Sequence, residues 1–201
     1  MKSPDSIPKP HLVPASPPSE RHVIDDHVFY LAAPSQRRVL IRLLSDVRAS
    51  QLLPQCSSAC YAVALLVRRF LLARKVRARL VDCTVIIKSG DLGYVIGQGF
   101  ARPGQIDGHL VCLMNDRVLV DFGLGVVSKH LIPGFPQGVA VSLNKNDPHQ
   151  LASAKLPNGN KVFWIKAAAP VGKKEFLAEQ MPVVNAIYRR WHLAISPPAR
   201  G

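Results

Sequence analysis

The apolar residues of this chain change their spacing near residue 79, and this change limits the folds available to it. Before this point they recur at helical spacing, from Val39 to Val47 and again up to about Arg74. After it, the run Leu80–Ile87 is strand-like, and glycines separate it from further apolar segments. A block of helices followed by a block of strands is typical of an α+β domain.

Three helices are expected in the first part of the chain. One begins near residue 19 and ends at Pro34, a second follows a cap at Ser35, and a third runs from Ser57 or Ser58 to about residue 74. The third is rich in Ala, Leu and Val and apolar nearly all round, so we expect it to be buried. The apolar positions of the first two are Val23, Ile24, His27, Val28, Tyr30 and Leu31, then Val39, Leu40, Leu43, Leu44 and Val47.

The second part is expected to form an antiparallel sheet and a closing helix. Asn115-Asp116 and Asn158-Gly159 mark hairpin turns. The closing helix covers about residues 172–192 and is kinked at Pro182. The expected strands are Leu80–Ile87, His109–Met114, Arg117–Phe122, Val139–Leu143 and Val162–Ile165.

The 201 residues are enough for one domain with its own core. We expect residues 1–20 to be a flexible tail, because their many prolines exclude a helix or a central strand. Residues 21–195 then form the single domain, and residues 196–201 a flexible C-terminus.

The chain carries 26 basic and 13 acidic residues, a net charge of +13 that favours contact with phosphates, anionic lipid or an acidic partner. The longest apolar run, Tyr61–Val67, is too short to span a bilayer, and no secretory signal pattern is present. These features predict a soluble, cytoplasmic protein. The four cysteines, at 56, 60, 83 and 112, have neither metal-site spacing nor disulfide density, so we expect free thiols.

Three residues have the chemistry of a cysteine nucleophile and its helpers. Cys60 lies in the first turn of the third helix, where unpaired N–H groups and the helix dipole stabilise a thiolate. His109 and Asp121 lie on facing strands of the expected hairpin, close to opposite each other, so Asp121 can hold the imidazole in one tautomer. A carboxylate between the apolar residues at 120 and 122 also needs a partner if it is buried.

These residues stand in segments that resemble a known family. The segment from Cys60-Tyr-Ala-Val-Ala-Leu-Leu to Val76-Arg-Ala-Arg79 resembles the nucleophile helix of the transglutaminase-like superfamily, which an Ile-Pro-Ala-Arg segment closes. Gly108-His-Leu-Val and Leu119-Val-Asp121 are similar to the His and Asp strands of that family. The run Asp121-Phe-Gly-Leu-Gly125 also resembles the end of the Asp strand in arylamine N-acetyltransferases, although their Arg-Gly-Gly lead-in to the cysteine is absent.

This resemblance, which covers about residues 55–125, implies a papain-like fold and cysteine-dependent acyl transfer or amide hydrolysis. Cys60 would be the nucleophile, His109 the base and Asp121 the residue that orients the base. The Cys60 backbone N–H would bind the oxyanion, and Gln55 is a candidate second donor by analogy with papain-like enzymes. No metal or organic cofactor is needed, and the substrate would be a protein, a peptide or a small acyl or amide compound.

Two alternatives stay open. Cys56 is a rival nucleophile, although its place ahead of the helix cap favours a packing role. The basic run Arg68–Arg79 fits a protein that binds nucleic acid or another anionic surface on the same fold, without turnover. No recognised binding motif or aromatic platform accompanies this run, so we expect such contacts to be weak. A further group on the first helix lacks the second cluster that a metal site needs and is assigned to a solvated face: His22, Asp25, Asp26 and His27.

Overall fold

The structure is a computed structural model that describes residues 20–24, 26–31, 33–49, 60–97, 106–144 and 146–195. The segments expected to be flexible, at 1–20 and 196–201, lie outside these ranges apart from Glu20, and so do the expected helix caps Ser57 and Ser58. The described elements are β1 (Glu20–Ile24), β2 (His27–Leu31), α1 (Pro34–Ala49), α3 (Cys60–Ala73), β3 (Ala78–Ser89), β4 (Leu92–Ile96), β5 (His109–Met114), β6 (Val118–Asp121), α4 (Gly125–His130), β7 (Gly138–Ser142), β8 (Gln150–Lys155), β9 (Lys161–Lys166) and α5 (Lys173–Ile195).

The first expected helix is wrong, because its residues form the hairpin β1–β2. Val23 pairs with Val28, and β2 pairs on its other side with β7, which buries both Val28 and Phe29. In segments of five residues, apolar spacing does not separate a helix from a strand that is covered on both faces. The many β-branched and aromatic side chains of this segment favour the strand.

The other expected helices are present. α1 starts with Pro34 itself, whose fixed φ suits the first helical position, and it buries Leu40, Leu43 and Val47 as predicted. α3 is buried over most of its length and ends at Ala73, just before Lys75 adopts a positive φ of 57°. α5 contains Pro182 and extends three residues beyond the predicted end at residue 192.

All nine strands of the described residues join one sheet, in the order β1-β2-β7-β6-β5-β3-β9-β8, with β4 beside β3. The sheet is mixed, because β2 and β7 run parallel, whereas the sequence predicted antiparallel pairing throughout. The predicted β5–β6 hairpin is confirmed. Its turn residues Asn115 and Asp116 both have positive φ, at 52° and 50°, as a tight hairpin turn requires. β4 and the short α4 were not expected from the sequence, and β8 was implied only by the predicted hairpin turn at Asn158-Gly159.

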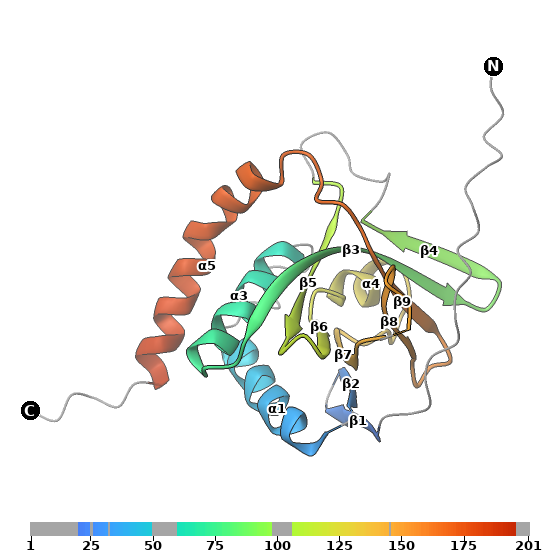
Figure 1. Cartoon of the computed structure of the whole chain (residues 1–201), viewed down its shortest axis with the longest axis horizontal. Helices are drawn as coiled ribbons and strands as arrows, with labels where there is room; N and C mark the ends of the chain where they lie inside the picture. The colour runs from blue at the N-terminus through green and yellow to red at the C-terminus, as the bar shows by residue number, and fades with distance from the viewer. Residues whose placement is uncertain are drawn as a thin grey trace, which may run out of the picture.

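The two faces of the curled sheet contribute to two different cores. Figure 1 shows α1, α3 and α5 together on one side of the strands, while α4 lies among the strands. The helix side packs one large core that includes Leu66, Phe70, Cys112 and Val120. The inner side of the curl packs a second core from strands and α4, including Val111, Leu119 and Trp164. Helices segregated onto one side of a largely antiparallel sheet make an α+β fold, as predicted.

None of the helices in the described ranges combines the length and the apolar character needed to cross a membrane.

Candidate active site

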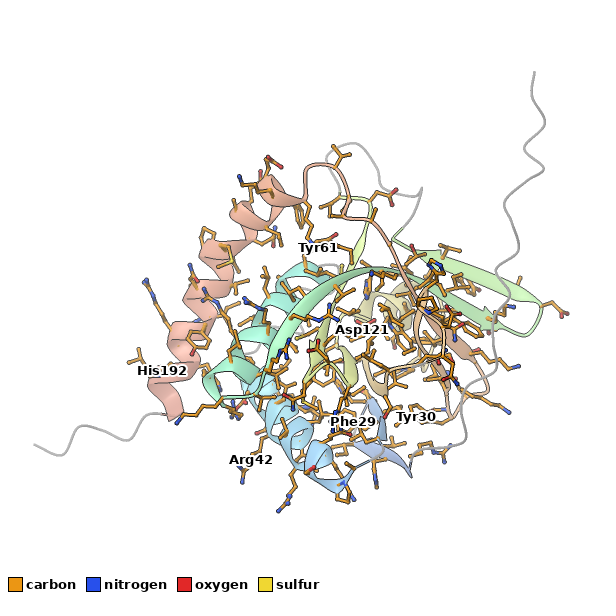
Figure 2. All side chains as sticks on the ribbon, in the orientation of Figure 1. Phe29, Tyr30, Arg42, Tyr61, Asp121 and His192 are labelled. Carbon is orange, nitrogen blue, oxygen red and sulfur yellow. The ribbon has the colours of Figure 1, made fainter. Side chains whose placement is uncertain are left out.

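The three candidate residues lie at the ends of their elements. Cys60 is the first residue of α3, His109 is the first of β5 and Asp121 is the last of β6. Because β5 and β6 are antiparallel, the first residue of β5 and the last residue of β6 lie at the same end of the two strands. Figure 2 shows Asp121 in the middle of the molecule, among the strands, and Tyr61 at the upper end of α3.

His109 and Asp121 form a buried pair. His109 Nε2 lies 2.8 Å from Asp121 Oδ2, and the residues are 2% and 1% exposed. They are diagonal neighbours, whereas the sequence predicted positions close to opposite each other. Cys112 pairs with Val120, so the same register would place Asp121 opposite Val111 and His109 opposite Gly123, two residues further along. Diagonal side chains on one face remain within reach of a long side chain such as His.

The Cys60 side chain is close enough to the His109 imidazole to act on its protonation. The thiol also lies 4.0 Å from the carbonyl oxygen of Gly108, the residue just before the histidine. One imidazole therefore has the Asp121 carboxylate on Nε2 and the Cys60 thiol as a near neighbour.

The surroundings of His109 favour its protonated form. Burial on its own would lower the pKa of His109. The Asp121 carboxylate and the Cys60 side chain act in the opposite direction through charge and hydrogen bonds, and together they hold the pKa well above its ordinary value of 6.5. An imidazolium beside a thiol favours the thiolate, which is the form that attacks carbonyl groups.

Two further groups hold the Asp121 carboxylate, and sequence reasoning identified neither. The backbone N–H of Gly123 donates to Oδ1 at 3.0 Å, and the indole Nε1–H of Trp164 donates to Oδ2 at 2.8 Å. Trp164 lies on β9, three strand intervals from β6, which is roughly 14 Å across a flat sheet. Only the curl of the sheet brings the two side chains together. The sequence predicted a strand over residues 162–165, but not the bond between Trp164 and Asp121.

Two glycines leave room for Cys60 between the ends of β5 and β6. A Cβ atom on Gly123 would lie 2.9 Å from the Cβ of Cys60, and one on Gly108 would collide with the Tyr61 hydroxyl. α3 packs on the helix side of the sheet, whereas His109 and Asp121 face the inner side. Because these two glycines have no side chains, the first residue of α3 can approach His109 past the ends of β5 and β6.

The other residues that the sequence singled out do not join the group of Cys60, His109 and Asp121 in the described part of the chain. Gln55 and Cys56 lie outside the described residues. Cys83 and Cys112 are buried strand residues, as expected, and burial raises the pKa of both thiols, that of Cys112 to about 12. His22 and His27 lie on β1 and β2 and not on a helix. Among the residues that the structure describes, no three His, Cys, Asp or Glu side chains are grouped to hold a metal ion.

Tyr61 is a neighbour of the site that the sequence did not point to. Its side chain is buried, and its hydroxyl makes no hydrogen bond with any described residue. Burial raises the pKa of Tyr61, and the nearby Cys60 and Asp82 raise it further, so the phenol stays protonated. It is an unused hydrogen-bond donor next to the nucleophile.

Comparisons with known proteins returned no family model, no curated protein and no solved structure that matches this chain. The likeness to transglutaminase-like proteins and to arylamine N-acetyltransferases therefore stands on the sequence motifs alone. The chemistry available to the site follows from the contacts among Cys60, His109 and Asp121.

Proposed function

We propose that this protein is a cysteine enzyme that performs acyl transfer or amide hydrolysis, with Cys60 as nucleophile, His109 as base and Asp121 as the residue that orients the base. The observation that carries the proposal is the position of His109, which is hydrogen-bonded to Asp121 through Nε2 and lies near the Cys60 side chain. A buried imidazole that a carboxylate holds near a thiol is the arrangement that a cysteine triad needs.

The reaction would proceed in two steps. The Cys60 thiolate attacks the carbonyl carbon of an amide, the His109 imidazolium gives its proton to the leaving amine, and the C–N bond breaks to leave a thioester on Cys60. Water or an amine then attacks the thioester while His109 takes a proton from the attacking atom. The C–S bond breaks, and the thiolate and the imidazolium are restored.

The oxyanion of each tetrahedral intermediate needs donors near Cys60. The first N–H groups of a helix have no carbonyl partner within it, so the backbone N–H of Cys60 at the start of α3 can serve as one donor. Gln55 remains the candidate for a second. The substrate would be a protein, a peptide or a small acyl or amide compound, and a cytoplasmic location stays a prediction.

Brief alkylation with iodoacetamide near neutral pH, followed by mass mapping, tests the nucleophile without a known substrate. We expect Cys60 to react fastest, because it is half-buried beside His109 whereas Cys83 and Cys112 are 1% and 0% exposed. His109→Gln should slow the labelling of Cys60 at least tenfold. His149→Gln, which changes an exposed histidine, should leave the rate unchanged.

Incubation with p-nitrophenyl acetate tests the covalent step. Wild-type protein should become acetylated at Cys60, and Cys60→Ser should remove the acetyl-thioester. Preferential labelling or acetylation of Cys56 would move the nucleophile and contradict the proposed triad. Equal labelling of wild type and His109→Gln would show that His109 does not act on the thiol.

A further inference from the structure

Three of the six cations in the basic run that the sequence singled out are paired with acidic residues. Arg74 lies 2.5 Å from Asp46 in an ion pair, and Arg77 and Arg79 both pair with Asp116, at 3.1 and 2.5 Å. An anion would have to compete with these carboxylates for the three guanidinium groups. This part of the run is therefore less available to a polyanion.

A different set of basic residues, distant in sequence, forms a row across the sheet. Lys88 on β3 stands directly opposite Lys161 on β9, and Lys161 stands directly opposite Lys155 on β8. Side chains of directly opposite residues share one face of the sheet, so the three lysines project together. Neighbouring strands lie about 4.8 Å apart, so this lysine row (Lys88, Lys161 and Lys155) is roughly 10 Å long.

The lysine row carries three like charges with no acidic partner. All three side chains are exposed, and within the described ranges no carboxylate forms an ion pair with any of them. Like charges directly opposite on neighbouring strands destabilise a sheet. The strands cannot slip to relieve the repulsion, because on the other face the next row, Ile87, Val162 and Ala154, is buried in register.

The surface around the lysine row is low and open. Gly93 extends the row on β4, opposite Lys88, and Gly90 and Gly159 lie in the adjoining turns. A Cβ atom on any of these glycines would have no heavy atom within 4 Å. Figure 1 shows the β3–β4 hairpin extending away from the helices, so no helix of the described residues covers this end of the sheet. With respect to these residues, a long polymer could lie across the row.

We propose that the lysine row is a binding site for the phosphate backbone of a nucleic-acid strand. Lysine ammonium groups are point charges on flexible stems, which suit phosphates rather than base edges, so binding should not depend on base sequence. A lipid surface fits less well. Membrane-surface binding uses large apolar side chains beside the charges, whereas the neighbouring row offers Val95 at 39% exposed and a buried Phe163.

This site is separate from the proposed enzyme site and does not depend on it. Cys83 on β3 pairs with His109, and Lys88 lies five residues further along the strand, roughly 17 Å away. Cys83 and Lys88 also point to opposite faces, because their positions differ by an odd number. A bound strand would leave Cys60 accessible.

The test compares two triple variants that lower the net charge equally, from +13 to +10. One is Lys88→Gln with Lys155→Gln and Lys161→Gln. Its control is Arg37→Gln with Arg38→Gln and Arg42→Gln, which removes three exposed arginines from α1 (Figure 2 labels Arg42). Binding of a fluorescent single-stranded 20-mer of mixed sequence is measured by anisotropy over a range of salt concentrations.

We expect the lysine variant to bind at least tenfold more weakly at low salt. The slope of log affinity against log salt should become shallower by about 2, which is about 0.7 for each of three lost phosphate contacts. The control should lose less than threefold. The melting temperature of the lysine variant should stay close to that of wild type, which shows that the variant is folded, because loss of the Lys88 contact with the Phe163 ring opposes the relief of like-charge repulsion.

Two outcomes would overturn the proposal. Equal weakening by both triple variants would mean that only net charge matters. No binding of the oligonucleotide by wild type, together with binding to phosphatidylserine vesicles that the lysine variant loses, would assign the row to lipid.

Discussion

The two tryptophans of this chain make the same bond in two different regions. Trp164 donates its indole N–H to Asp121 at 2.8 Å inside the curled sheet, and Trp191 donates to Asp46 at 3.0 Å between α5 and α1. All four residues are at most 7% exposed. What differs is the cation on the other side of each carboxylate.

Asp46 is paired with Arg74, which is always charged and has no proton to exchange. Asp121 is paired with His109, whose charge can change and which lies near a thiol. The same Trp–Asp bond therefore fastens two helices in one region, while in the other it holds a carboxylate against a proton carrier. A buried tryptophan–aspartate bond is not by itself a sign of function, because the third partner decides its role.

Replacing each aspartate by asparagine should separate the two regions most strongly. Asp121→Asn should keep the fold but lower turnover by about 10⁴, because an amide can hold the imidazole in the wrong tautomer. The pH profile of Cys60 alkylation should also shift to higher pH, since the imidazolium loses its carboxylate. Asp46→Asn should lower the melting temperature and leave the alkylation profile where it was.

Both variants are measured by alkylation rate against pH and by thermal melting. If Asp121→Asn melts at a lower temperature but alkylates as wild type does, Asp121 is a structural residue and at most a Cys60–His109 dyad remains.

Close to Asp121, the backbone of Gly123 approaches Cys60, and none of the described glycines makes such an approach near Asp46. Filling the space at Gly123 should have the next largest effect. Gly123→Ala would place a Cβ 2.9 Å from that of Cys60 and should displace the thiol from His109. Displacements near 1 Å cost about 100-fold in rate, so acetylation by p-nitrophenyl acetate should slow by about that factor. Gly125→Ala is the matched control, because a Cβ there has no heavy atom within 4 Å. An equal loss in both variants would show that the contact is unimportant.

Substituting the tryptophans tests the comparison directly. Trp164→Phe and Trp191→Phe each remove one indole N–H from a buried carboxylate, and each should lower the free energy of unfolding by about 2 kcal/mol or more. Only Trp164→Phe should also slow acetylation, by about tenfold, and shift its pH profile, because only Asp121 orients a base. If both variants lose stability and neither changes the pH profile, Trp164 fastens the strands and does not position Asp121.

The smallest expected difference is in how stability depends on pH. The pKa of His109 is raised in the folded protein above its ordinary value of 6.5. Its contribution to stability is therefore complete below about pH 6.5 and is lost as the pH rises through the raised value. Wild type should lose stability relative to His109→Gln as the pH rises above about 6.5. The Asp46–Arg74 pair should show no such change, since Arg74 stays charged. Denaturant titrations across this range measure both, and parallel curves for wild type and His109→Gln would contradict the raised pKa.

The sequence predicted the parts of the site that depend on local pattern. The β5–β6 hairpin, the start of α3 near Cys60 and the burial of α3 all follow from apolar period and turn residues. Contacts set by the order and curl of the strands could not be predicted in this way. Trp164 reaches Asp121 across two intervening strands, and Lys88 meets Lys161 only because β9 pairs with β3. An apolar period of two residues predicts which face of the sheet a residue lies on, but not which residue of another strand it contacts.

The N-terminal hairpin was missed for a related reason. β2 lies between β1 and β7, and its partner residues in β7 begin at Gly138, more than a hundred positions later in the chain. A strand covered on both faces loses the alternation that marks it in a sequence.

The late position of Trp164 also has a consequence for the newly made protein. A ribosome that adds roughly 5–20 residues per second finishes Cys60, His109 and Asp121 several seconds before the strand that carries this tryptophan. Until β9 joins β3, Asp121 lacks its indole donor and the inner core lacks Trp164. The buried surroundings of His109 and Asp121 are therefore complete only after β9 has been made and has paired with β3.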